Sequence, residues 1–197
     1  IGNTVVVTVT KDANVSCTFD NTRDTATIKV VKNVTAAAGV TDGSFEFSSN
    51  ITTLGEGGNF SLTTVGGTAS TETVTVPTGS YNIAESVPEG WTLTSQDCTG
   101  TEANPDGGLY FELSKDDVVV CTFTNTRDTA TIKVVKNVSA QGGVTDGTFN
   151  FLSDSLLGNF SLTTVGGTAS TATVTVPTGT FSVSENIPAG WTLQDIS

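Results

Sequence analysis

Residues 22–34 read TRDTATIKVVKNV, and residues 126–138 repeat the same letters without a change. A second stretch, GNFSLTTVGGTAST at 58–71, recurs at 158–171. Such repetition, at a period of about 100 residues, indicates copies of one unit that has the length of an ordinary small domain. The repeat therefore decides how the rest of the sequence is divided.

The two ends of the chain hold incomplete copies of this unit. VSCTFDNTRDTA at 15–26 matches VVCTFTNTRDTA at 119–130, so the chain begins with the end of a repeat. Ser197 corresponds to Asp97, so the last repeat has no counterpart of residues 98–125. We expect three parts: residues 1–21, a donor hairpin that completes a neighbouring repeat; residues 22–125, a complete β-sandwich (the first repeat); and residues 126–197, a β-sandwich that lacks its last hairpin (the second repeat).

Short β-branched runs between glycine turns predict an all-β protein. Apolar and polar residues alternate within these runs, as in Phe45/Phe47 and Val74/Val76, which places one face of each strand in a core. Seven or eight such strands in about 100 residues are typical of an antiparallel Ig-like sandwich. The strands expected in the first repeat are 26–34, 44–48, 59–64, 71–77, 80–85, 91–95, 108–114 and 118–125.

Composition argues against several classes of function. The net charge of −12 disfavours binding to nucleic-acid backbones or anionic membranes. No apolar run approaches the roughly 18 residues of a membrane span. There is no histidine, which excludes Ser-His-Asp and Cys-His sites and the usual zinc sites, so we predict neither an enzyme nor a cofactor. Four acidic loop residues are either calcium ligands or solvated carboxylates, and the absence of EF-hand spacing favours the second interpretation: Asp42, Asp116, Asp117 and Asp146.

Three segments resemble a known family. They read IKVVK at 28–32, YNIAESVPEGW at 81–91 and FTN at 123–125. In order and spacing they are similar to the Cna B-type and SpaA-like domains of prealbumin-like fold, which occur in tandem in bacterial pilins and surface adhesins. The resemblance covers essentially the whole repeat and implies an extracellular protein of the cell surface.

The resemblance also implies a covalent cross-link. In such domains a lysine of the first strand joins an asparagine of the last strand in an isopeptide bond, assisted by a glutamate. Lys32, Asn125 and Glu85 match these positions, and strand alternation points all three inward. Desolvation favours a neutral, nucleophilic lysine and a protonated glutamate that can polarise the amide. The alternative is an ordinary ion pair between Lys32 and Glu85, with Asn125 hydrogen-bonded.

The second repeat carries the same lysine and glutamate, at Lys136 and Glu185. The asparagine that matches this pair is Asn21 of the N-terminal segment. A bond at this place would therefore link two chains.

The chain has three cysteines, an odd number. Cys98 follows the strand that begins at Trp91, and Cys121 lies on the last strand, so we expect them to form a disulfide, with two buried thiols as the alternative. A bridge implies an oxidising compartment. Cys17 matches Cys121 but has no second cysteine to pair with in this sequence, so it is either free or contacts another subunit.

Six N-x-S/T sequons are candidate glycosylation sites, although chance occurrence explains such matches equally well in a Thr-rich chain. They lie at Asn14, Asn33, Asn50, Asn59, Asn137 and Asn159.

These observations favour a structural subunit of an extracellular filament or pilus. Each copy would donate residues 1–21 to the second repeat of the next copy, so its partners are copies of itself. The alternative is a stalk segment of a long tandem-repeat adhesin. A third hypothesis, a module that binds a cell-surface or carbohydrate target, lacks the exposed aromatic stripe that such sites usually need.

Overall fold

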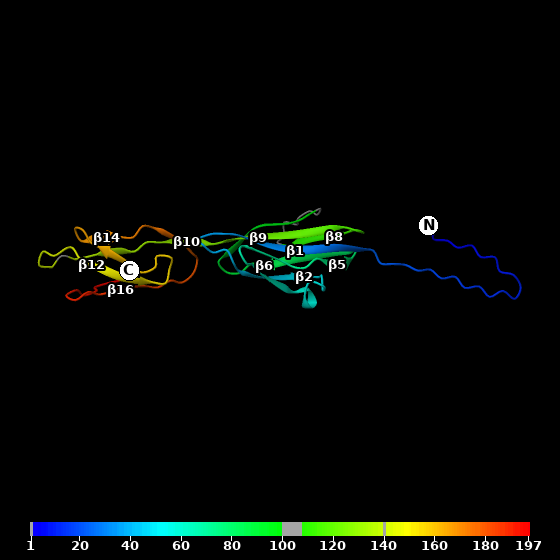
Figure 1. The fold of residues 1–197 in the computed structure, drawn as a ribbon, viewed down its shortest axis with the longest axis horizontal. Helices are drawn as coiled ribbons and strands as arrows, with labels where there is room; N and C mark the ends of the chain where they lie inside the picture. The colour runs from blue at the N-terminus through cyan, green and yellow to red at the C-terminus, as the bar shows by residue number, and fades with distance from the viewer. Residues whose placement is uncertain (1, 100–107, 140) are drawn as a thin grey trace.

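The computed structural model describes residues 2–99, 108–139 and 141–197. The chain is elongated, with a complete sandwich in the middle, smaller sheets at one end, and the N-terminal segment extending from the other end (Figure 1). The predicted all-β class with antiparallel sandwich architecture is confirmed. One short 3-10 turn, η1 (Glu56–Gly58), interrupts the strands, and no helix in the described residues has the length and hydrophobicity to span a bilayer.

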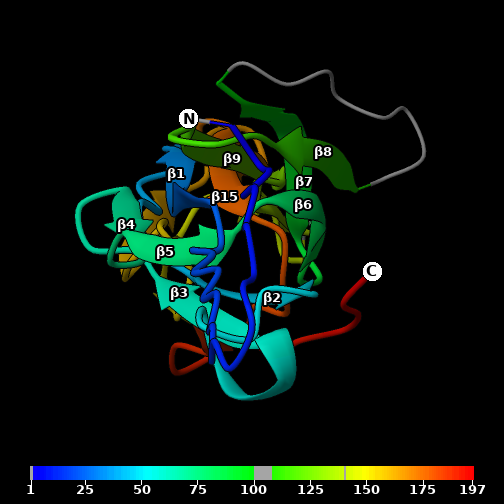
Figure 2. The same ribbon diagram turned by 90° about the vertical axis from the view of Figure 1, so that its right-hand side faces the viewer.

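The first repeat consists of two sheets, with β1 and β9 on one side and β2 and β3 on the other (Figure 2). We call them the β1 sheet and the β2 sheet. The β1 sheet has the order β4 (Thr68–Ser70), β1 (Thr25–Thr35), β9 (Val118–Arg127), β7 (Trp91–Cys98), and β5 (Val74–Pro77) also pairs with β1. The β2 sheet has the order β3 (Phe60–Thr63), β2 (Ser44–Ser49), β6 (Gly79–Ser86), β8 (Leu109–Leu113).

The first and last strands of this repeat run parallel, with Thr27–Thr35 opposite Val118–Thr126. All other strand pairs among the described residues are antiparallel. Parallel neighbours need a long crossover connection, and here the body of the repeat provides it. As a result, β9 lies in the middle of the sheet, and removing it would separate β1 from β7.

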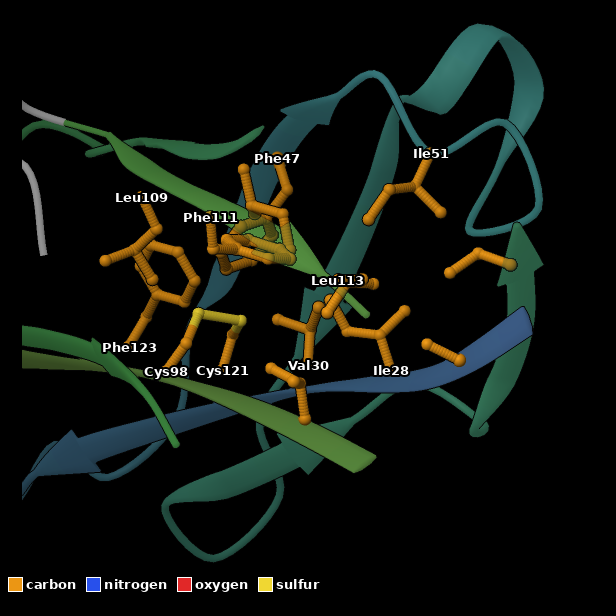
Figure 3. Close-up of a cluster of buried hydrophobic side chains, with 14 of the residues drawn as sticks. Ile28, Val30, Phe47, Ile51, Cys98, Leu109, Phe111, Leu113, Cys121 and Phe123 are labelled. Carbon is orange, nitrogen blue, oxygen red and sulfur yellow. A yellow bond between two sulfur atoms is a disulfide. The ribbon is translucent and has the colours of Figure 1, made fainter. Parts of the chain in front are cut away.

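The core lies between the two sheets and follows the predicted alternation. On β1, every second residue from Ala26 is buried. Figure 3 shows apolar side chains of both sheets meeting around the bond between Cys98 and Cys121. Each large side chain buried in this way contributes about 1.5–3 kcal/mol. The core includes Ile28, Val30, Phe45, Phe47, Ile51, Ile83, Leu109, Phe111, Leu113, Val119 and Phe123.

The eight expected strands are present, with one addition. The expected strand 71–77 is reduced to β5, and the short β4 precedes it. A two-residue turn makes β4 possible: Gly66 and Gly67 have φ of 63° and 88°, and Val65 N donates to Thr68 O at 3.0 Å. Positive φ at both central residues suits glycine and is typical of tight hairpins.

The second repeat forms smaller sheets. Its core contains Phe149, Phe151 and Leu162, with Trp191 packed against it. β10 pairs only with β15, β11 only with β14, and β12 lies between β13 and β16. The strands are β10 (Thr129–Ile132), β11 (Val135–Asn137), β12 (Thr148–Ser153), β13 (Phe160–Thr163), β14 (Thr168–Ser170), β15 (Val174–Pro177) and β16 (Val183–Asn186).

Residues 2–24 form no strand and are exposed throughout. They leave the body of the protein at the start of β1 and reverse direction once (Figure 1).

Candidate functional site

Lys32, Glu85 and Asn125 meet inside the first repeat, each from a different strand. Glu85 lies between the other two: Lys32 Nζ is 3.3 Å from Glu85 Oε2, and Asn125 Nδ2 donates to Glu85 Oε1 at 2.5 Å. The side chains of Lys32 and Glu85 have no exposed surface, and Asn125 is fully buried. One carboxyl group thus bridges a buried amine and a buried amide.

The surroundings of Lys32 are mostly apolar. Its Nζ lies 4.3 Å from the centroid of the Phe45 ring and donates to the carbonyl oxygen of Phe123 at 3.5 Å. Burial lowers the pKa of Lys32 below 10.5, and the charge of Glu85 and its hydrogen bond do not fully offset this effect. A lowered pKa increases the fraction of neutral amine, which is the nucleophilic form.

Two oxygens in this cluster are buried without a hydrogen bond among the described residues, namely Glu85 Oε2 and Asn125 Oδ1. An unsatisfied buried acceptor costs on the order of 1–3 kcal/mol. If Glu85 carries a proton and the Asn125 amide turns over, the carboxyl O–H can donate to the amide oxygen. The cluster can therefore polarise an amide next to a neutral amine, which is what amide exchange requires.

The second repeat contains the lysine–glutamate pair without an asparagine next to it. Lys136 Nζ lies 2.8 Å and 3.0 Å from the two carboxylate oxygens of Glu185, and 4.3 Å from the ring centroid of Phe149. The Lys136 and Glu185 side chains are 14% and 9% exposed. The described residues contain no strand in the position of β9, so this pair remains partly open to solvent.

The edges left open in the second repeat are those that β8 and β9 close in the first. β1 pairs with β9, and β6 pairs with β8. Their counterparts β10, β11 and β16 have no partner on the corresponding side among the described residues. The second repeat thus has two open edges, one on each sheet.

The N-terminal segment repeats the inward-facing residues of β8 and β9. The four side chains that β9 buries recur unchanged, and the three that β8 buries are matched by valines. The β9 set is Val119, Cys121, Phe123 and Asn125, matched by Val15, Cys17, Phe19 and Asn21; the β8 set is Leu109, Phe111 and Leu113, matched by Val5, Val7 and Val9. Phe19 is 63% exposed, so this apolar surface is uncovered in the single chain.

The turn within the N-terminal segment has the same backbone as its counterpart between β8 and β9. Asp12 and Asp116 have φ of 65° and 63°. Ala13 N donates to Thr10 O at 3.1 Å, as Asp117 N does to Ser114 O at 3.3 Å. Because β8 and β9 belong to different sheets, residues 1–21 are better described as two prospective strands joined by a turn between sheets than as a paired hairpin.

Cys98 and Cys121 form a disulfide between the neighbouring strands β7 and β9, with their Cα atoms 3.9 Å apart. The sequence separation is 23 residues, and a bridge of this length typically stabilises a fold by about 3 kcal/mol. Cys17 is exposed and free in the described chain.

The sequons differ in how far their amides are already engaged. Asn50 donates to Ser80 O at 3.1 Å and accepts from Asn82 N at 3.0 Å, so a glycan on Asn50 would disturb this contact with β6. Glycosylation remains a prediction at all six. Asn14, Asn50, Asn59, Asn137 and Asn159 are exposed, and Asn33 is half-buried.

Among the described residues, no group of three or more His, Cys, Asp or Glu could hold a metal ion. The acidic loop residues instead stabilise turns. Asp42 accepts a hydrogen bond from Gly67 N at 3.0 Å, and Asp117 accepts one from Ser114 N at 2.7 Å.

Residues 28–127 match the family of the prealbumin-like fold domain. The chain belongs to this family. The resemblance seen in the sequence is thereby confirmed, and the match covers the prealbumin-like fold domain from β1 to the end of β9.

No curated protein matches the sequence. Among solved structures, the prealbumin-like fold domain and the rest of the chain are similar to three proteins at low sequence identity. The Bacillus anthracis TIE protein has a TM-score of 0.43 and 15% identity; the match covers 88% of this chain and 31% of that one. The Streptococcus pyogenes major pilins T3.2 and T-13 have TM-scores of 0.44 and 0.43, with identities of 13% and 14%. Those matches cover 84% and 87% of this chain, and 84% and 86% of the respective pilins.

Proposed function

We propose that this protein is a structural subunit of an extracellular, cell-surface filament or pilus that polymerises head to tail. Residues 1–21 of one copy complete the second repeat of the next. One observation carries the proposal: the residues that β9 buries recur unchanged at 15–21, while the edge that β9 would cover in the second repeat is open. The partner of the protein is therefore another copy of itself, and its role is structural and not enzymatic.

The energetics favour such donation. Phe19 in the place of Phe123 would face the core around Phe149, and Val15 would take the place of Val119. Full burial of a valine or phenylalanine side chain contributes about 1.5–3 kcal/mol. The added strands would also satisfy the backbone groups of the open edges, which are otherwise a template for aggregation.

The donor segment cannot reach the second repeat of its own chain. Asn21 lies four residues before the start of β1, and four residues span at most about 14 Å. β1 has 11 residues, about 36 Å at roughly 3.3 Å each, and the second repeat lies beyond its far end (Figure 1). Donation is thus between chains, and a head-to-tail contact that does not close produces a filament.

A covalent step would strengthen the first repeat. The neutral Nζ of Lys32 attacks Cγ of Asn125, the bond between Cγ and Nδ2 breaks, and Nδ2 leaves as ammonia. Glu85 takes up the proton lost by Nζ and returns one to the leaving nitrogen, so it is unchanged at the end. The buried cluster with its neutral-leaning lysine supports this chemistry.

The same reaction between copies would link the subunits covalently. Lys136 and Glu185 of one chain would receive Asn21 from the next, in the relation that Lys32 and Glu85 have to Asn125. Burial of the pair by the donated strand would then lower the proton affinity of Lys136, as burial does for Lys32.

Electron microscopy and size-exclusion chromatography of the purified chain test polymerisation. We expect filaments from the natural chain and monomers from Phe19→Asp, because a carboxylate cannot take the place of Phe123 in a core. Val6→Asp is the matched control, since the counterpart of Val6 is Tyr110, which is 56% exposed in the complete sandwich. Filaments from Phe19→Asp, or monomeric rods from the natural chain, would contradict the proposal and favour an adhesin stalk.

A further inference from the structure

The junction between the two repeats is held by Arg127 and Asp128. Arg127 donates through Nη1 to Gly90 O and through Nη2 to Thr178 O, the latter at 2.6 Å. Thr178 N donates to Asp128 O at 2.9 Å, and Asp128 N donates to Gly90 O at 2.9 Å. One arginine thus connects the turn before β7 of the first repeat to the turn after β15 of the second.

The same face of the first repeat has half of this arrangement at the N-terminal end of the sandwich. Arg23 donates through Nη2 to Thr78 O at 2.8 Å, and Thr78 N donates to Asp24 O at 3.1 Å. These are the counterparts of the contacts that Arg127 and Asp128 make with Thr178. Arg23 Nη1 has no partner among the described residues, although its counterpart binds Gly90.

The other half lies at the far end of the second repeat. PAGWT at 188–192 matches PEGWT at 88–92. In both turns the tryptophan N donates to the proline O at 3.2 Å, and the glycine has positive φ, 83° at Gly190 and 77° at Gly90. The tryptophan packs edge-on against a phenylalanine at 5.0 Å in the second repeat and 5.1 Å in the first. The receiving surface therefore has its final shape before any partner binds.

The two glycines differ in one respect. A Cβ built on Gly90 would lie within hydrogen-bonding range of the guanidinium of Arg127 and 2.9 Å from Thr178 Oγ1, whereas a Cβ on Gly190 would meet no atom within 4 Å. Gly90 is thus covered by the next repeat, and Gly190 is an open copy of the same surface.

We propose that Arg23 and Asp24 of one copy bind the Gly190–Thr192 turn of another copy with the contacts of the internal junction. Arg23 Nη1 donates to Gly190 O, Asp24 N donates to Gly190 O, and the Arg23 guanidinium lies over Trp191, as Arg127 does over Trp91 at 5.5 Å. Thr192 Oγ1 donates to Asp24, as Thr92 does to Asp128 at 2.6 Å. The inference rests on the proposed head-to-tail filament and adds a surface that strand donation alone does not require.

This surface fixes how neighbouring copies are rotated about the filament axis. A donated strand leaves some rotational freedom at the turn that follows it, whereas an arginine bonded to both sides removes that freedom. All repeats along the filament would then be equivalent. The rise and rotation per subunit would equal two successive applications of the movement that carries the first repeat onto the second within one chain.

Cryo-electron microscopy of the natural filaments tests this inference. We expect one helical symmetry whose rise and rotation agree with that doubled internal movement, and density joining Arg23 to the Gly190 turn. Arg23→Ala filaments should keep donation, with residues 15–21 protected from protease, but show a broad distribution of rotations. Lys11→Ala, a change in the exposed turn of the donor segment, is the control and should leave the symmetry unchanged.

The outcomes separate this inference from the proposed function. Ordered filaments with another symmetry, or Arg23→Ala filaments as regular as the natural ones, would overturn the junction and leave strand donation intact. Absence of filaments from the natural chain would overturn both.

Discussion

The two repeats share long stretches of identical sequence and yet differ in structure. TRDTATIKVVKNV gives one continuous strand in the first repeat, β1, but two short strands in the second, β10 and β11, with a break at 133–134. GWTL begins β7 in the first repeat, whereas residues 191–197 form no strand. β6 has 8 residues and its counterpart β16 has 4.

The elements that are lost or shortened are those that touch β8 or β9 in the first repeat. β7 and β1 pair with β9, and the first half of β6 pairs with β8. Elements that pair within the body of the repeat, such as β2 with β3, keep the same register in both copies. Strand formation in this protein therefore depends on the neighbouring strand more than on the residues within it, as expected when β-propensity mainly reflects packing.

The largest effect should come from giving the second repeat its missing strands within one chain. We expect that appending a copy of residues 98–125 after Ser197 stabilises the second repeat by several kcal/mol, because it buries a valine, a phenylalanine and the β8 side chains. Hydrogen exchange should then show residues 191–197 protected, and the chain should be monomeric because its acceptor edge is filled.

A matched variant makes this experiment decisive. The same appended copy with aspartate in place of its Phe123 counterpart should leave residues 191–197 unprotected and restore polymerisation. If both extended chains polymerise like the natural one, strand donation is not what joins the copies.

The contrast between the repeats also shows what could be predicted from the sequence. Period-2 alternation was sufficient to predict that Lys32 points inward with Ile28 and Val30, since all three are fully buried. The parallel pairing of β1 with β9 could not be predicted, because alternation gives the face of a strand and not its neighbour. The short β4 was missed because three residues after a glycine turn carry no periodicity.

The site was predictable to a similar depth. Identity between 15–26 and 119–130 identified the donor segment, because each inward residue had a counterpart. The role of Arg127 at the junction was not predicted, since nothing in the sequence places Gly90 and Thr178 on either side of it. Only the arrangement of the two repeats in space brings these turns together.

A smaller effect should come from glutamate variants that separate the two repeats chemically. In Glu85→Gln the proton carrier of the first repeat is lost, so we expect the intact mass to increase by one ammonia relative to the natural chain, beyond the change due to the substitution. A cross-link that closes a loop of this size contributes on the order of 4 kcal/mol, which the first repeat should lose. Mass spectrometry and urea denaturation measure the two quantities.

Glu185→Gln provides the comparison in the second repeat. It should leave the mass of the monomer unchanged apart from the substitution, and remove the ladder of detergent-resistant oligomers. If the natural chain already has the mass of its unmodified sequence, Lys32 and Glu85 form an ordinary buried ion pair instead.

The smallest effect concerns pH and isolates the lysine that the two repeats bury to different extents. In Glu85→Gln, Lys32 keeps a free amine, and burial lowers its pKa from 10.5 without an opposing carboxylate. Because the folded pKa is below the unfolded one, the unfolded chain binds more protons between these values, so the free energy of unfolding rises with pH across this window and levels off above 10.5. The slope is at most about 1.4 kcal/mol per pH unit. Urea titrations from neutral pH upward should show this rise, and the double variant with Lys32→Met should lack it; equal profiles would mean that water reaches the amine and that the first repeat is as open around its lysine as the second.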